Sequence, residues 1–439
     1  MSEFERLGQG LATGQWVSLS PEAEAAPIAQ LPPGPGVVVR SGGSSGGSSY
    51  CAQPSLHLDC SAAATAHWLT GIGLDPAATL LLNPLPLAHV SGLMPWWRAR
   101  CWGAGHQQLA PGLMKTPTEL LAFCRSMPAW GIKPVLLSLV PTQLARLLAH
   151  PDGVAFLQQL QPGLMKNPTE LLACCRSLPA WGTKPVLLSL VPTQLARLLA
   201  HPDGVAFLLE MQLIWIGGAV LGPQLAAQAR ALMLPLAPCY GSTETAAMVA
   251  AMPPDRFLAG EPGCGDPLVD VELRLAADGA LEVRTDRLAL GRWSADQPDR
   301  FEQLKDADGW WRSGDRAAFT PGLQIMGRMD GAIHSGGETV FPEPLEQRLM
   351  AAAQAVSVPV SAVLLLGVDD SEWGQRLVAL VGSADAAVLP RLMALTRSWS
   401  PAETPRRWVL CPALAPSVLG KWQRQRWRNW LERLDSAKA

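Results

Sequence analysis

The chain has 439 residues, of which 48% are hydrophobic and 16% charged, and its formal net charge is −2. This composition excludes a disordered chain and leaves room for two to four domains or subdomains of roughly 100–200 residues each. The nearly balanced charge gives no support for a nucleic-acid-binding surface.

Targeting and membrane segments are not expected. The start, MSEFERLGQGL, lacks a basic region followed by an apolar stretch, so no signal peptide is predicted. The most apolar run, TLLLNPLPLAHVSGLMPWW, contains three prolines, and no transmembrane helix is predicted. The nine cysteines show no CxxC pair or metal-ligand spacing, which favours free thiols in a reducing cytoplasm.

The first distinctive stretch is VVVRSGGSSGGSS at 37–49, an apolar strand followed by glycine and serine. Glycine lets successive backbone N–H groups point inward and serine adds hydroxyl donors, so such a loop can wrap a polyphosphate. A flexible linker is the alternative. Phosphate loops usually carry a lysine, and this one has none.

A near-identical tandem repeat follows at 111–161 and 162–212, with only seven differences in 51 positions. Each copy is predicted to form a helix, a buried strand and a second helix. In the first copy, Thr116 and Glu119 are placed to form a capping box, 133–140 is the strand, and Pro141 opens the next helix.

Apolar runs alternate with helical patterns through the repeat and on to LPLAPCYGSTET at 234–245. This alternation predicts a large α/β domain with a mainly parallel sheet over 1–328. Short strands with polar turns begin after about residue 266. A small α+β domain is expected over 331–439, with a hinge near Asp330.

Four further motifs contain groups suited to nucleotide chemistry, although each also has a purely structural interpretation. They are YGSTET at 240–245, RSGD at 312–315, GRMDGAIHSGGETVFPEPLE at 327–346 and LGK at 419–421. Hydroxyl and carboxylate groups can bind a nucleotide and Mg²⁺, but they also cap turns and helices. Lys421 is one of only three lysines outside the repeat, and it can equally be a solvated surface residue.

The order of these motifs is more specific than any one of them. Taken with SGGSSGG, PLPLAHVSG and IGGAVL, they resemble the adenylate-forming family of acyl-CoA synthetases, aryl-CoA ligases and luciferases, in order from about residue 37 to 421. The short chain and the SGGE form of the hinge block are most similar to the branch that activates 2-succinylbenzoate for menaquinone or phylloquinone biosynthesis.

The resemblance implies an N-terminal AMP-binding domain, a small C-terminal domain, and a two-step reaction that uses ATP, Mg²⁺, a carboxylic acid and coenzyme A. The acid carboxylate attacks the α-phosphorus of ATP, and the CoA thiol then displaces AMP. Positioning and charge stabilisation at phosphorus are what such a step needs from the protein.

The resemblance also assigns roles by motif position. Lys421, Thr243, Glu244 and His89 would be catalytic, with Glu244 also holding Mg²⁺, and Asp330 would be the hinge. The nucleotide would contact the remaining motif residues, which are Ser41, Gly42, Gly43, Ser44, Ser45, Gly46, Gly47, Gly217, Gly218, Ala219, Tyr240, Gly241, Asp315 and Arg328. His89 can alternatively be a packing residue.

Two departures from the family pattern matter. Ser48 and Ser49 stand where the family loop ends in Pro-Lys, which removes a cation that Arg40 or another arginine could replace. The family has the repeated segment once. We therefore expect one copy to fill the native position and the other to extrude as an aggregation-prone unit.

The alternatives to 2-succinylbenzoate activation are a ligase for another aryl or acyl acid, and a degenerate nucleotide-binding homologue without turnover. Arg98 and Arg100, which follow the HVSG motif, are candidates to bind a second carboxylate of the substrate.

Overall fold

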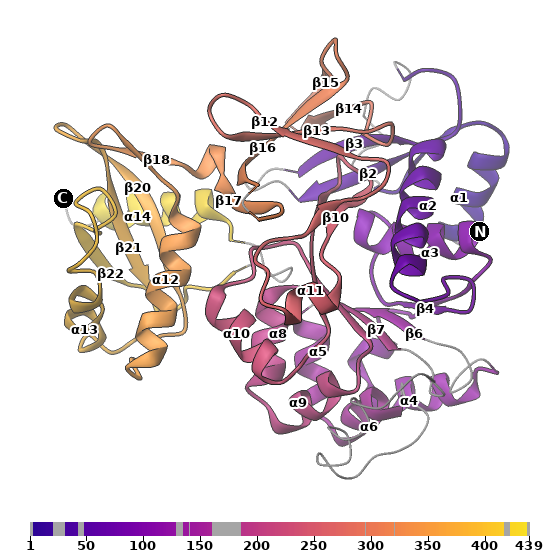
Figure 1. Cartoon of the computed structure of the whole chain (residues 1–439), viewed down its shortest axis with the longest axis horizontal. Coiled ribbons are helices and arrows are strands. Elements are labelled where there is room, and N and C mark those ends of the chain that lie inside the picture. The colour runs from indigo at the N-terminus through magenta and orange to yellow at the C-terminus, as the bar shows by residue number, and fades with distance from the viewer. Residues whose placement is uncertain are drawn as a thin grey trace.

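The computed structural model describes residues 3–20, 31–42, 48–128, 135–139, 141–159, 186–294, 296–319, 321–416 and 422–436. The chain forms a large lobe and a small lobe that lie side by side (Figure 1). It passes from one to the other at the 3-10 turn η4 (Met329–Gly331).

The described residues of the large lobe form three sheets. In spatial order, the central eight-stranded sheet contains β11 (Asp266–Pro267), β10 (Ala247–Ala251), β9 (Leu236–Ser242), β8 (Leu213–Ile216), β7 (Val186–Leu190), β6 (Val135–Ser138), β4 (Leu80–Asn83) and β5 (Gly105–Gln108). A five-stranded sheet contains β1 (Trp16–Ser18), β2 (Gly36–Gly42), β3 (Ser48–Pro54), β14 (Gly291–Ser294) and β15 (Gln297–Gln303). A four-stranded sheet contains β12 (Glu272–Leu275), β13 (Ala280–Arg284), β16 (Trp310–Ala318) and β17 (Gln324–Arg328).

The central sheet is parallel from β5 to β9, as its apolar strands predict, and antiparallel at β10 and β11. Helices cover both of its faces. The helices of the large lobe are α1 (Glu3–Ala12), α2 (Ser55–Gly71), α3 (Val90–Trp102), α4 (Pro117–Ser126), α5 (Pro141–Leu148), α6 (Pro151–Gln159), α8 (Pro192–Leu199), α9 (Pro202–Leu209), α10 (Pro223–Ala231) and α11 (Pro254–Leu258).

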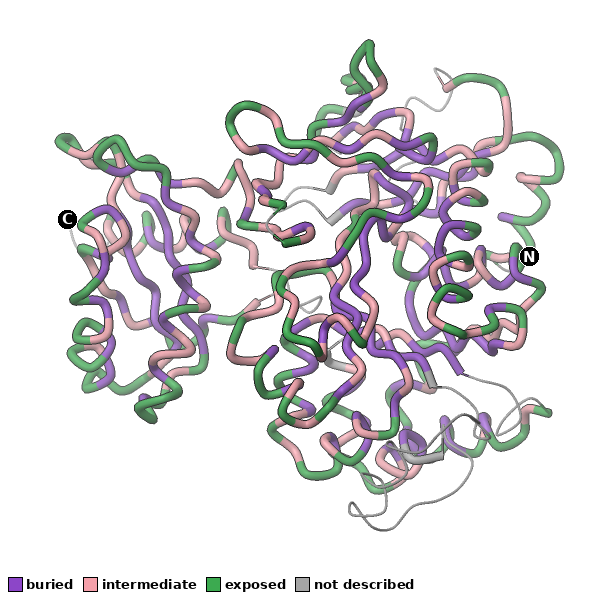
Figure 2. Tube along the Cα trace, in the orientation of Figure 1, coloured by how far each residue is buried: buried purple, intermediate pink, exposed green. Residues whose placement is uncertain are grey.

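Side chains alternate between the two faces of each central strand, so the sheet separates two cores. Leu81 and Leu187 pack in a core with α2, α3 and the five-stranded sheet. Leu82 and Leu188 pack in a second core with the repeat helices and α10. Figure 2 shows the resulting band of buried strands through the large lobe.

In the described parts of the repeat, the strand of each copy is inserted in the central sheet and is followed by its helices, so the expectation that one copy extrudes is wrong. β6 of the first copy and β7 of the second are neighbouring parallel strands in which Val135 pairs with Val186 and Ser138 with Ser189. These partners are equivalent positions of the two copies. A parallel sheet can accept an extra strand–helix unit because an inserted strand forms hydrogen bonds on both sides and offers the same edge to the next strand.

The helices of the two copies are also stacked in parallel order. Helices α5 and α6 follow β6, and helices α8 and α9 follow β7; the predicted single helix is broken in each copy before Pro151 and Pro202. Leu147 and its counterpart Leu198 are both fully buried. The apolar faces that an extruded copy would expose are therefore covered by the neighbouring copy and the sheet.

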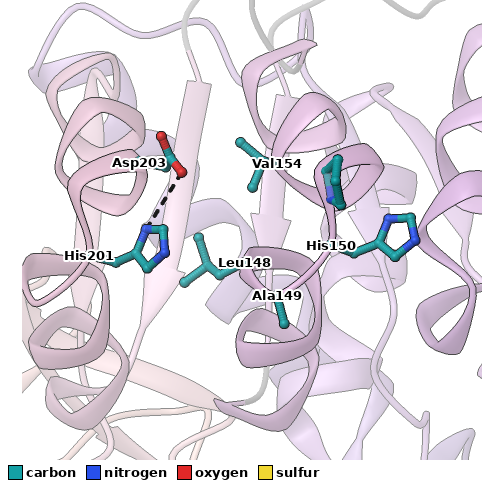
Figure 3. A pocket seen from close by; sticks show the side chains of 7 residues that line it. Leu148, Ala149, His150, Val154, His201 and Asp203 are labelled. Carbon is teal, nitrogen blue, oxygen red and sulfur yellow. Dashed lines mark ion pairs between the residues drawn. The ribbon is translucent and has the colours of Figure 1, made fainter.

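A pocket of about 460 Å³ lies at the seam between the copies. His150 and Pro151 of the first copy line it, together with His201 and Asp203 of the second (Figure 3). The two histidines occupy equivalent positions in the repeat. The nucleotide-site residues predicted from the motifs do not line this pocket.

Helix α4 begins at Pro117 as predicted, but the capping box does not form. The Thr116 side chain makes no bond to the helix backbone, and its hydroxyl donates instead to the Glu119 carboxylate at 2.9 Å. The contact between the two side chains engages the Thr116 hydroxyl and the Glu119 carboxylate, which a capping box would instead use to bond backbone N–H groups.

The small lobe consists of a five-stranded sheet with helices on both faces. Its strands are β18 (Ile333–Ser335), β19 (Glu338–Val340), β20 (Val363–Asp370), β21 (Gly374–Val381) and β22 (Arg407–Leu410), and its helices are α12 (Pro342–Ala355), α13 (Val388–Leu395) and α14 (Arg424–Ser436). Helices α12 and α13 pack on one face and α14 on the other. Among the described residues, no helix is long and apolar enough to cross a membrane.

Candidate active site

The candidate site is built where the β2–β3 hairpin meets the YGSTET segment at 240–245, called the YGSTET loop below, which comprises the end of β9 and the turn that follows it. Gln53 of β3 is fully buried, and its side-chain amide donates to the backbone oxygens of Thr243 at 2.8 Å and Glu244 at 3.3 Å. Residues 190 positions apart are thereby held together. The strand that leaves the glycine- and serine-rich turn is thus fixed to the YGSTET loop.

Thr245 holds the YGSTET loop in shape. It is fully buried, its hydroxyl donates to the Ala247 backbone oxygen at 2.7 Å, and it accepts from the Ser242 backbone N–H at 2.9 Å. At Gly241, a side chain would begin 2.1 Å from that same Ala247 oxygen. The loop therefore requires glycine at 241 and a small hydroxyl residue at 245.

Tyr240, Asp315 and Arg328, which the motifs assign to the nucleotide, come together from β9, β16 and β17. The Tyr240 hydroxyl donates to Asp315 Oδ2 at 2.6 Å, and Arg328 Nη1 lies 3.5 Å from Asp315 Oδ1. Arg328 also bonds Asp330 through Nε at 3.1 Å and Nη2 at 2.9 Å. The Asp315 carboxylate thus links Tyr240 of the central sheet to Arg328 at the start of the interlobe turn.

Burial dominates the electrostatics of this cluster. It raises the pKa of Tyr240 well above the usual value for a phenol, and the nearby Asp315 carboxylate adds to the effect. Burial also raises the pKa of Asp315, although the Tyr240 hydroxyl and the Arg328 cation oppose that change. Tyr240 therefore remains a hydrogen-bond donor at neutral pH.

Glu244 projects from the same loop with a side chain only 12% exposed, and Arg292 Nη1 lies 3.9 Å from its Oε1. Within the described ranges there is no group of three or more metal-binding side chains. A single carboxylate is compatible with Mg²⁺, which commonly takes one or two protein carboxylates and completes its shell with phosphate oxygens and water.

The other predicted residues surround this loop. Gly217 and Gly218 follow β8; a side chain at Gly217 would begin 2.9 Å from Cys239 Sγ, and Gly218 has a φ of +76°, which favours glycine. Ala219 follows them on the same turn. His89 precedes α3, and its Nδ1 lies 3.3 Å from the Arg40 backbone oxygen, next to the start of the glycine- and serine-rich turn.

The predicted phosphate loop begins at the end of β2. Ser41 is buried at the end of β2, and Gly42 is the last residue of that strand. The predicted phosphate-binding residues Gly43, Ser44, Ser45, Gly46 and Gly47, and the predicted catalytic Lys421, lie outside the described residues.

Several residues of the site were not found by sequence reasoning. Gln53 and Arg292 lie in strands without a recognisable motif, and their importance comes from contacts with a loop far away in sequence. Thr245 was part of the quoted YGSTET motif, but its buried position only becomes clear from the fold.

Comparison with known proteins identifies the family to which this geometry corresponds. A family model described as "AMP-binding enzyme" matches residues 56–287, more than half of the chain. The matched segment includes the central sheet and the YGSTET loop.

Curated relatives match over shorter segments. A 2-succinylbenzoate–CoA ligase of Salmonella typhimurium is 35% identical over 203 residues, which cover 45% of this chain and 40% of the relative. The Escherichia coli protein of the same name is 31% identical over 246 residues, 56% of this chain and 51% of the relative. The chain thus spans about half the length of the curated relatives it matches, or less.

Solved structures share the fold over nearly the whole chain. Escherichia coli MenE with bound OSB-AMS gives a TM-score of 0.58 at 24% identity, covering 90% of this chain and 68% of the other. MatB from Rhodopseudomonas palustris with bound ATP gives 0.61 at 18% identity, covering 90% and 67%. At these identities the likeness establishes an adenylate-forming fold.

Proposed function

Because the chain belongs to the AMP-binding enzyme family, we propose that it is an ATP-dependent acid–CoA ligase that activates 2-succinylbenzoate through an acyl-adenylate. The observation that carries this proposal is the convergence of Tyr240, Asp315 and Arg328 beside the Glu244 loop. The curated relatives named for this activity support the choice of substrate. The reaction belongs to menaquinone or phylloquinone biosynthesis and is expected in the cytoplasm.

The proposed chemistry follows from these groups. An oxygen of the acid carboxylate forms a bond to the α-phosphorus of ATP as the bond to pyrophosphate breaks. The carboxylate is already a nucleophile, so the protein supplies alignment and positive potential instead of a general base. The CoA thiol then loses its proton to solvent, its sulfur bonds to the acyl carbon, and AMP leaves with the electron pair of the acyl–oxygen bond.

In this proposal the Asp315 carboxylate accepts hydrogen bonds from the ribose hydroxyls, and Arg328 orients that carboxylate. Thr243 contacts the α-phosphate, and Glu244 would hold Mg²⁺, which supplies charge neutralisation on the phosphates when bound. Gly217, Gly218 and Ala219 line the adenine and acyl pocket. His89 closes the acyl side, and Lys421 reaches the carboxylate and α-phosphate.

Arg98 supports a substrate with a second carboxylate. Its Nη2 donates to Thr65 Oγ1 at 3.3 Å, while Nε is buried and makes no hydrogen bond. Thr65 bonds Ser61, which also accepts from Arg287. Two guanidinium groups therefore share one interior network.

The charges in this network do not balance among the described residues. Asp270 pairs with Arg287 at 2.8 Å, and no described carboxylate pairs with Arg98. Burial, helped by the nearby Arg287, lowers the pKa of Arg98 to about 10. Because it is costly to remove part of a cation from water without a counter-ion, an anionic group of the substrate would stabilise the half-buried Arg98 side chain. We assign that role to the second carboxylate of the substrate, which in 2-succinylbenzoate is the benzoate group.

The test is pyrophosphate release and thioester formation with ATP, CoA and a panel of mono- and dicarboxylic acids. We expect 2-succinylbenzoate to give both products, and Arg98→Ala to lose most of its preference for dicarboxylic over monocarboxylic acids. Pyrophosphate without thioester would restrict the protein to adenylation. No release with any acid would contradict the ligase proposal and favour the second candidate, a nucleotide-binding protein without turnover, for which Ser49 in place of lysine is the specific argument.

A further inference from the structure

The position of the missing lysine is structurally defined although the turn before it is not described. Ser49 is the second residue of β3, and it pairs with Ser41 of β2 on one side and Ser294 of β14 on the other. Strand β14 thus runs beside the exit of the predicted phosphate loop. Any cation on the same face of β14 is close to the position that lysine would occupy.

Arg292 is on that face. It lies two residues before Ser294 in β14 and pairs with Cys51, and alternate residues of a strand share a face. This face packs toward the large-lobe core, because Val39 and Cys51 belong to that core while Tyr50 and Trp293 pack on the opposite side. Arg292 therefore points toward the body of the site, where Glu244 lies.

The Arg292 guanidinium is held so that one nitrogen faces the site. Nε lies 2.8 Å and Nη2 3.1 Å from the two oxygens of the Glu302 carboxylate, a bidentate pair across β14 and β15. Nη1 instead extends toward Glu244 Oε1 at 3.9 Å. The hydrogen bonds to Glu302 raise the pKa of Arg292, so the group remains charged.

The exposure of the three side chains follows the same direction. Glu302 is 58% exposed, Arg292 is 37% exposed and Glu244 is 12% exposed. The Arg292 guanidinium thus lies between its surface partner Glu302 and the more buried Glu244 of the YGSTET loop. Phosphates bound beside Glu244 would therefore be close to the Arg292 Nη1 group.

We propose that Arg292 supplies the positive charge for the β- and γ-phosphates that the lysine at position 49 would otherwise supply, with Glu302 as its positioning residue. This inference rests on the proposed function. When the bond between the α-phosphorus and the bridging oxygen breaks, negative charge accumulates on the departing pyrophosphate. The Nη1 group stabilises that charge by hydrogen bonding, without a proton transfer.

The first experiment compares the binding of MgATP and AMP to wild type and Arg292→Ala by calorimetry. We expect the Kd for MgATP to rise about tenfold or more, in line with the loss of one charge-assisted contact, while the Kd for AMP is unchanged. AMP lacks the β- and γ-phosphates, so a general distortion of the site would weaken both nucleotides. Arg292→Gln, which keeps most of the side-chain length, serves if the alanine variant does not fold.

Arg284→Ala is the matched control. Arg284 makes a similar bidentate cross-strand pair with Glu272 and has a 43% exposed side chain, but it lies on a different sheet. The Arg284→Ala substitution should leave the affinities for MgATP and AMP unchanged. A variant at Arg284 that reproduces the Arg292 effect would overturn the proposal, because the effect would then be one of net charge.

The second experiment restores the cation at the family position. In ATP–pyrophosphate exchange, Arg292→Ala should be slowed about 10- to 100-fold, and the double variant Ser49→Lys, Arg292→Ala should regain most of that loss. Unchanged MgATP binding by Arg292→Ala, or a double variant that is folded but not rescued, overturns the proposal. If wild type shows no exchange with any acid while Arg292→Ala still loses MgATP selectively, the ligase function fails and the role of Arg292 stands.

Discussion

At the scale of single residues, Asp315 connects the parts of the site. Its carboxylate accepts from Tyr240 and faces Arg328, which in turn holds Asp330 at the interlobe turn. Because the carboxylate is largely buried, replacing it removes the acceptor of the Tyr240 hydroxyl and one of the ion pairs of Arg328. The loss of a hydrogen bond to a charged group typically costs about 1.5–3 kcal/mol.

Asp315→Ala should therefore weaken AMP and MgATP binding equally, by about 10- to 100-fold, because both nucleotides carry the same ribose. Calorimetric titration with each nucleotide measures the effect. Asp278→Ala, which removes an exposed aspartate paired with Arg312, should leave binding unchanged. Selective weakening of MgATP alone would place Asp315 at the phosphates and not at the ribose.

A second residue-scale feature is His106 on β5. Its Nε2 is buried without a hydrogen-bond partner, and its ring packs against Phe4 with centroids 5.6 Å apart. Burial lowers the pKa of His106 from 6.5 to about 4. The folded state thus keeps this histidine neutral at a pH where the unfolded chain binds a proton.

The sign of the pH dependence follows directly. As the pH falls from about 6.5 toward 4, protonation of the unfolded state lowers the free energy of unfolding. Urea unfolding at a series of pH values should show that His106→Gln reduces this acid-side loss, whereas His67→Gln at an exposed site should not. An unchanged slope in His106→Gln would show that other groups cause the acid sensitivity.

At the scale of elements, the tandem repeat extends the sheet. β6 and β7 pair in register, and the helices behind them repeat the same contacts. Gly153 and Gly204 occupy equivalent positions where a side chain would begin only 2.2 Å and 2.3 Å from the backbone oxygens of Leu147 and Leu198. The close approach of the helices is therefore preserved in both copies.

Leu147→Ala and Leu198→Ala should each destabilise the protein by about 2–5 kcal/mol, because both side chains are fully buried and each substitution leaves a cavity. Denaturant unfolding provides the measurement, and Leu56→Ala, at a side chain that is 66% exposed, is the control. A large effect in one copy and none in the other would show that only one copy is packed in solution.

At the scale of the whole molecule, the two lobes have separate cores and limited contacts. Arg316 lies over the Phe341 ring at 5.0 Å, and the Gln347 amide donates to the Val220 backbone oxygen at 3.3 Å. Within the small lobe, Arg424 Nη1 bonds Glu346 Oε1 at 2.8 Å and also the Leu365 backbone oxygen. This pair joins α14 to α12 across the sheet.

Arg424→Met should lower the stability of the small lobe by about 3–5 kcal/mol, because Glu346 is left buried and unpaired. Calorimetry should then show a transition at lower temperature, separate from that of the large lobe. Adding Glu346→Leu should recover much of the lost stability, because it removes the buried carboxylate that has no ion-pair partner. A single shifted transition for the whole chain would show that the lobes unfold together.

Local sequence patterns were sufficient for much of this protein. The apolar runs before Gly217 and Tyr240 predicted β8 and β9, Pro117 and Pro141 predicted the starts of α4 and α5, and the order of the motifs predicted the adenylate-forming fold. These features depend on backbone preferences and hydrophobic periodicity, which neighbouring residues determine.

Contacts between distant segments were decided by the tertiary structure. Insertion of both repeat copies depended on the open hydrogen-bonding edges of a parallel sheet, and the loss of the Thr116 cap depended on how its side chain is oriented. The proximity of Arg292 to Ser49 and Glu244 depended on strand register across more than 200 residues. The sequence by itself therefore determined the family and the kinds of chemical groups available. Only the packed sheets decided which charged side chain lies beside which loop. The physical reason is that strand register and packing bring together residues that no local pattern relates.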